Sequence, residues 1–468
     1  MIRQIAKKEI QHNLYSIRFP ALLLISAVLF ILNAVLAVTE PVQDISNPAP
    51  DVRYTWAMRQ HNTLQFCVRE DSIDRTQWVL IWASGRIRLS MQNSSWGLPM
   101  GDRLGRFSLP HADRIDWMFI IKTVFSLFAI IFTFDAVCWE RESGTLTLIC
   151  SNSVSRSSVL LGKYLGTCGT LFIPFVVGII LNLLIIASGI AGEVSLKTEH
   201  WLRMGLLILA SIAYISLFAL LGLLVSSAVR TSSTSLMILL TLWVVFVIVH
   251  PNLAGVIAEN RSKMESRYQL RQRLNALWWM EGRQELIEQS EKDKVKTQEE
   301  FDKIVEKVLS KRAKTINDIE SRHRNALAEK RRLARRIAIV SPAAIYHYIG
   351  EAIADSGFER QQRFLKAAQS FYPVYEDYIR RKVGKVNPMG GRTNITIWRN
   401  IDGKRVEFRA TRPEPYEGDM SDFPYFTESR WTIVDSLRIS LNNLAVLLLW
   451  NVVLFVTAHY VFVRRSLK

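Results

Sequence analysis

Six long apolar blocks constrain this 468-residue chain more than any other feature. They lie at roughly 19–38, 115–134, 165–190, 204–228, 233–250 and 440–463. A helix needs about 20 apolar residues to cross the hydrocarbon core of a bilayer, and each block has or approaches that length. Because 22% of the residues are charged and 49% are hydrophobic, the charges must be concentrated between the blocks. We therefore expect a multi-pass membrane protein, not a soluble or disordered chain.

The basic residues beside these blocks predict the orientation. They gather before the first block, after the last, and in the loops between blocks two and three and between blocks four and five. They are Arg3, Lys7, Lys8, Arg18, Arg141, Arg156, Lys163, Arg230, Arg464, Arg465 and Lys468. Short cytoplasmic loops carry an excess of Lys and Arg. Six spans with both termini in the cytoplasm satisfy this pattern, and the first block is long enough to be a retained span, not a signal peptide.

These spans divide the chain into five parts. We expect residues 1–38 to hold the cytoplasmic N-terminus and span one, and 39–114 an extracytoplasmic lobe. Residues 115–250 hold spans two to five with a cytoplasmic elbow at 135–164. Residues 251–438 form a large extracytoplasmic insertion, and 439–468 hold span six and the cytoplasmic C-terminus.

Two patterns predict the structure of the insertion. Apolar residues from Phe301 to Leu309 repeat at three- and four-residue spacing, as in packed amphipathic helices. We expect two or three long helices with a weak break at Gly282, and a further helix near 351–370. Residues 393–411 alternate around Asp402-Gly403, which predicts a β-hairpin. The expected fold class is mainly α: a six-helix transmembrane bundle with a large, mostly helical extracytoplasmic domain containing a small β-hairpin.

Three polar residues lie inside predicted spans and are candidates for a substrate pathway: Lys122, Asn33 and Asn182. Intramembrane polar groups are costly, and this cost often marks function. Lys122, however, lies only about two turns from the outer boundary, so we favour snorkelling of its side chain to the interface.

The net charge of +17 invites a nucleic-acid interpretation, but the charge distribution argues against it. A basic run in the insertion comprises Arg331, Arg332, Arg335 and Arg336. We expect the charged face of a helix near the membrane, with contact to lipid headgroups or an acidic partner as the alternative. The four cysteines form no CxxC pair and there is no HExxH, so no metal site is expected. Cys67 lies far from the other three cysteines in the sequence. We expect it to be a buried free thiol, with an intermolecular disulfide as the alternative.

The segment 134–164 carries the most specific pattern. It reads FDAVCWERESGTLTLICSNSVSRSSVLLGKY, with charges directly after span two and an apolar stretch at 146–149 that predicts a short interfacial helix. The order of ERESGTL, SVSR and LLGKYLG resembles the elbow of ABC-2 type exporter permeases. Ser153 departs from that pattern, since many members carry proline there. Residues 221–251 and 341–371 resemble a bacterial branch with a large extracytoplasmic insertion between spans five and six.

The resemblance implies a coupling helix that docks on a separate ATPase subunit. The residues carried over are Glu140, Arg141, Glu142, Gly144, Thr145, Leu146, Arg156, Gly162 and Lys163. It also implies two ATPase copies that hold ATP and magnesium, a second permease (identical or paralogous), and location in the bacterial inner membrane. The chain has no GxxxxGK[ST] motif, so we expect no catalytic residue in it.

A second function class remains open. A helical insertion of this size exceeds what transport alone requires, so the chain is alternatively an ATP-driven mechanotransducer or scaffold acting on an extracytoplasmic partner. The sequence does not specify a substrate.

Overall fold

The computed structural model describes residues 2–39, 116–145, 155–188, 198–262, 264–355, 395–401, 404–410 and 432–465, with Arg363, Ser370, Val374, Asp377, Tyr378 and Arg381. The predicted lobe beyond Thr39, with Cys67, lies outside these residues. So do Leu146, the predicted helix at 146–149, the Asp402-Gly403 turn and most of 351–370.

Six helical segments in the described part are long and apolar enough to cross a membrane, which confirms the six-span prediction. Span one is α2 (Arg18–Thr39), and span two joins α5 (Trp117–Phe119), η1 (Ile120–Phe125) and α6 (Ser126–Thr133). Spans three and four are α9 (Arg156–Ala187) and α10 (Thr198–Ala228). Span five joins α11 (Ser232–Trp243), η2 (Val244–Val249) and α12 (His250–Arg261), and span six is α18 (Ile433–Arg465).

Spans two and five each contain a π-helical segment, η1 and η2. The second lies directly before His250-Pro251, where the proline lacks the N–H that a regular α-helix uses. A wider turn at this point accommodates the missing hydrogen bond. Span five therefore continues past its predicted end at 250 without a break.

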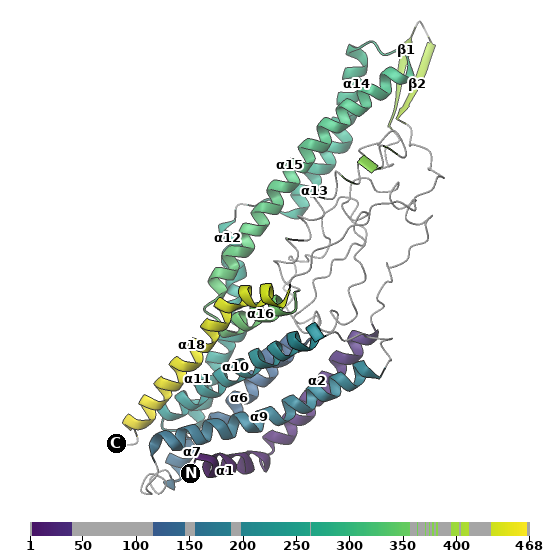
Figure 1. Cartoon of the computed structure of the whole chain (residues 1–468). Helices are drawn as coiled ribbons and strands as arrows, with labels where there is room; N and C mark the ends of the chain where they lie inside the picture. Colours follow the sequence, from purple (N-terminus) through teal and green to yellow (C-terminus); the bar gives the residue numbers. More distant parts are fainter. Residues whose placement is uncertain are drawn as a thin grey trace.

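Span four lies at the centre of the bundle (Figure 1). It contributes a continuous run of buried residues from Tyr214 to Leu223 and packs against spans two and six. Aromatic rings from three other spans fill the neighbouring core, with Phe30, Phe125 and Phe175 in edge-to-face contact. This dense packing leaves spans one, five and six with many exposed apolar side chains, as expected of lipid-facing helices.

The described ends of the chain lie at the same end of the bundle, which we call the elbow end (Figure 1). It also contains α1 (Ile2–Leu14) and α7 (Cys138–Glu142). We did not predict α1 as a helix. It packs along the start of α9, so the N-terminal segment is part of the folded bundle.

A helical stalk rises from the opposite end, the stalk end (Figure 1). Helices α12, α13 (Arg267–Asn275), η3 (Ala276–Glu281) and α14 (Gly282–Lys292) ascend, and α15 (Gln298–Ala338) returns. The break predicted at Gly282 is wrong, because helix continues through that residue. The chain instead turns at 293–297, where Lys294 is left-handed and Thr297 and Glu300 form a capping box that begins α15. Helix α16 (Pro342–Ile353) then packs at the base of the stalk, against η1, η2, α10 and α18.

The predicted β-hairpin is confirmed as β1 (Ile395–Ile401) and β2 (Lys404–Ala410) at the tip of the stalk. The strands are antiparallel, with Ile397 opposite Phe408. Both side chains are buried, and the ring of Phe408 lies 5.7 Å from that of Phe301. The tip therefore has its own apolar core, which joins the hairpin to α15.

We predict that Phe301→Ala opens this tip without affecting the bundle. Truncating a fully buried phenylalanine costs about 3–5 kcal/mol. Hydrogen exchange should show lost protection over 395–410 and the start of α15, with spans unchanged. Trp398→Ala is the matched control, because Trp398 is 53% exposed on the same hairpin and should cause little change. Unchanged protection of the hairpin in Phe301→Ala would contradict this account.

Candidate functional site

The elbow begins with a fixed ion pair beneath span two. Asp135 accepts two hydrogen bonds from the Arg18 guanidinium, at 2.6 and 3.1 Å. Arg18 also donates to the carbonyl of Ile131 at 3.0 Å. Two parallel bonds make this pair directional, so the end of span two is held to the start of span one.

The three charged residues that follow each bind a different span. Glu140 Oε1 lies 2.7 Å from Lys163 Nζ of α9. Arg141 donates to the Val229 carbonyl at 2.6 Å, directly after the end of α10. Glu142 accepts from the main-chain N–H of Ser232 at 2.9 Å, at the start of α11. The charges of these side chains suit the helix dipoles, because the Arg141 cation lies at the C-terminus of α10 and the Glu142 anion lies at the N-terminus of α11.

Lys163 is the most buried charge of the elbow. Only 3% of its surface is exposed, and its ammonium lies between Glu140 and Glu9 of α1, the latter at 3.4 Å. A buried charge is tolerated when paired, so two carboxylates from two helices are drawn to one position. The bridge joins α1, α7 and α9.

Gly162 and Gly144 have separate structural roles. A Cβ at Gly162 would lie 2.7 Å from Cγ2 of Ile5, so glycine permits the close approach of α1 to α9. Gly144 has φ +73°, a left-handed conformation that favours glycine after a helix end. Thr145 closes this turn with a hydrogen bond to the Glu140 carbonyl at 3.2 Å.

The outer surface of the elbow is available for contact. Trp139 is 53% exposed, and Glu142, Ser143 and Gly144 are exposed beside it. Trp139 stacks on His12 of α1. An aromatic ring on a short, rigidly held helix is a suitable anchor for a protein partner.

Arg156 lies away from this cluster. Its guanidinium donates to the Val463 carbonyl at 2.9 Å and so fastens the start of α9 to the end of α18. The structure therefore brings Glu140, Arg141, Glu142, Gly144, Thr145, Gly162 and Lys163 together and gives Arg156 a separate contact.

Two elbow partners were missed from the sequence. Glu9 was missed because α1 was not predicted, although the spacing of Ile2, Ile5 and Ile10 fits one helical face. Ser226 was missed because a serine in a predicted span carries no signal by itself. Its hydroxyl accepts from the N–H groups of Val137 and Cys138 at 3.0 and 3.2 Å.

The candidate pathway residues do not form one group. The amide of Asn182 donates to Asn33 Oδ1 at 2.9 Å and to the Phe30 carbonyl at 3.1 Å, which joins α2 to α9. Lys122 lies in η1 and is buried, with 7% of its surface exposed. Snorkelling to the boundary, which we favoured, is thus not observed. A pathway role for these three residues stays a prediction.

The basic run divides into two faces. Arg335 lies over the ring of Tyr348 at 4.6 Å, and Arg331 and Arg335 both attract Glu351. Burial by itself raises the pKa of Glu351, but His347 and the two arginines outweigh it, so the net pKa lies below the ordinary value. Arg332 and Arg336 are exposed. Half of the run therefore packs within the chain, and contact of the other half with lipid or a partner stays a prediction.

Six spans and an elbow bonded to four of them define a multi-pass membrane protein with a built contact surface at one end. The family model of ABC-2 family transporter proteins matches residues 3–467, so the chain belongs to this family, as the elbow pattern predicted. No curated protein matches the chain. The family supplies the permease component of ABC transporters, not the ATPase.

We predict that Lys163→Met destabilises the bundle. The substitution leaves Glu9 and Glu140 partly buried without their cation, and breaking a buried pair costs about 3–5 kcal/mol. Thermal unfolding of the purified protein in detergent should show a lower midpoint. Lys7→Met is the control, since Lys7 is exposed on α1. Equal midpoints for Lys163→Met and wild type would show that the bridge does not hold the elbow.

Proposed function

We propose that this permease exports a substrate in a complex with separate ATPase subunits, which bind at the elbow. The observation that carries the proposal is the triplet Glu140, Arg141 and Glu142, whose side chains bind spans three, four and five. Displacement of the elbow strains bonds to all three spans at once. Bonds to charged groups contribute about 1.5–3 kcal/mol each, so the spans should move with the elbow.

We propose the rest of the complex by analogy with the family. Two ATPase subunits hold ATP and magnesium, and the permease pairs with an identical or paralogous copy. The elbow end lies in the cytoplasm of a bacterium, with both termini, and the stalk lies outside the inner membrane. The basic residues of the elbow end support this orientation.

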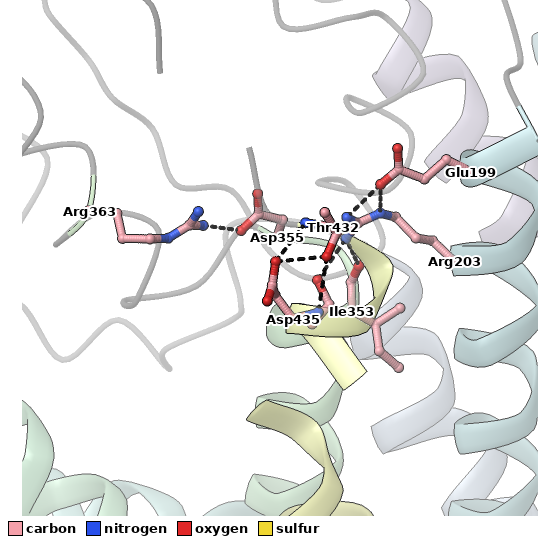
Figure 2. Close-up of polar contacts among 8 residues, drawn as sticks. Glu199, Arg203, Ile353, Asp355, Arg363, Thr432 and Asp435 are labelled. Carbon is pink, nitrogen blue, oxygen red and sulfur yellow. Dashed lines mark hydrogen bonds and ion pairs between the residues drawn. The ribbon is translucent and has the colours of Figure 1, made fainter. Parts of the chain in front are cut away.

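A second candidate, mechanotransduction to an extracytoplasmic partner, is favoured by the joint between stalk and bundle. Arg203 of α10 donates to the Ile353 carbonyl of α16 at 2.6 Å and to Ser436 of α18 at 3.0 Å (Figure 2). Glu199 holds the same guanidinium at 2.8 Å. Beside this joint, Thr432 binds Asp435 at the start of α18. Movement of span four would thus reach the stalk base directly.

We predict that the double charge reversal Glu140→Lys and Glu142→Lys abolishes the stimulation of the ATPase by the permease. The first change places a second cation against Lys163, and the second places a cation at the N-terminus of α11. ATP hydrolysis by the reconstituted complex is the measurement. Glu291→Lys with Glu306→Lys, both exposed in the stalk, gives the same change in charge as a control.

Trp139→Ala separates docking from folding, because the exposed ring is removed while the triplet keeps its bonds. It should weaken co-purification of the ATPase without lowering the unfolding midpoint. Wild-type stimulation in the double reversal, with full co-purification in Trp139→Ala, would refute the elbow as the docking surface.

A further inference from the structure

Lys122 is a charged group in the bundle that the elbow mechanism does not use. It lies in the π-helix η1 of span two, and 93% of its surface is buried. Within the described part of the chain, its ammonium makes no hydrogen bond and no ion pair. A charge inside a span is costly, so a buried ammonium without an ion-pair partner is a candidate binding group for an anion.

The two acidic residues that act electrostatically on Lys122 have other partners. Asp116 accepts the main-chain N–H of Phe119 at 2.6 Å, as the N-cap of span two. Glu351 pairs with His347 at 3.3 Å and is attracted by Arg331 and Arg335. Both carboxylates act on Lys122 through space, but neither lies within ion-pair distance.

The main chain and the aromatic groups around Lys122 are already satisfied. Its carbonyl accepts from Tyr214 at 3.1 Å and from Ser126 at 2.5 Å. Tyr214 stacks on Tyr346 of α16, whose hydroxyl binds Ser211 at 2.7 Å. This network holds η1 in place and leaves the ammonium as the group without a partner among the residues that the structure describes.

The depth and surroundings of Lys122 favour an amphiphile over a dissolved ion. Lys122 lies six positions after Asp116, about 9 Å along a helix. With Asp116 at the membrane surface, this depth is the level of headgroups and upper acyl chains. Span five packs beside span two through a hydrogen bond from Trp243 to Ser126 at 2.8 Å. On the same span, Val244, Val245 and Val249 are exposed, as suits contact with acyl chains.

We infer that Lys122 binds the anionic headgroup of an amphiphile in the leaflet at the stalk end, which makes an anionic lipid or lipid-like molecule the substrate class. The assignment as substrate rests on the proposed export function. The binding itself does not, and it can be measured without any ATPase.

The test is native mass spectrometry of the full-length permease in detergent with phosphatidylglycerol, with phosphatidylcholine as the neutral lipid. Wild type should retain phosphatidylglycerol in preference to phosphatidylcholine, and Lys122→Met should bind phosphatidylglycerol at least about ten-fold more weakly, because a charged hydrogen bond to the headgroup is lost. Lys122→Arg should keep most of the binding. Lys303→Met makes the same change at an exposed position of the stalk and should bind as wild type does.

Unfolding midpoints without lipid distinguish a ligand site from a structural ion pair. Removing an unpaired buried charge should leave the midpoint of Lys122→Met equal or higher. A lower midpoint, or undiminished phosphatidylglycerol binding, would overturn the inference. Stabilisation of wild type by inorganic phosphate equal to that by phosphatidylglycerol would overturn the choice of an amphiphile. Elbow variants that lose ATPase coupling should still bind phosphatidylglycerol, because the lipid site at Lys122 does not depend on the elbow.

Discussion

The elbow end depends on one buried ammonium. Lys163 cannot remain charged inside the protein without partners, and it receives one carboxylate from α1 and one from α7. This requirement positions the N-terminal helix and the elbow against span three. The neighbouring bonds of Arg141 and Glu142 then extend the same rigid unit to spans four and five.

The stalk end is held together by hydrogen bonds from side chains to main-chain carbonyl groups. In the hydrocarbon core every main-chain polar group needs a partner within the protein, and π-helical segments disturb the regular pairing. The carbonyl of Lys122 in η1 is taken by Tyr214, and that of Phe246 in η2 by Ser341 at the start of α16. Helix α16 thereby fits onto span five while Arg203 ties it to span four. The stalk base is thus bonded directly to spans four and five, and it packs against span six.

The family's charged triplet has a more specific role in this chain than its resemblance indicated. Glu140, Arg141 and Glu142 are each bonded to the end of a different span, and the exposed surface of the elbow is formed by Trp139, Glu142 and the turn at Gly144. In the mechanism we propose, the charges transmit movement, and the aromatic ring and turn are the surface that a partner reaches. Lys122 contrasts with Lys163, because no carboxylate of the described residues lies within ion-pair distance of it.

The sequence by itself determined the elements whose signals are local. Length and apolarity specified the six spans, alternation around Asp402-Gly403 specified the hairpin, and the order of the elbow residues identified the family. The predicted helix break at Gly282 was wrong, because a single glycine destabilises a helix by only about 1 kcal/mol and packing offsets that cost. Only the tertiary structure decided that Glu9 meets Lys163 across 154 positions and that Lys122 is buried instead of snorkelling. Pairing of buried charges depends on which helices lie side by side, and one sequence does not encode that arrangement locally.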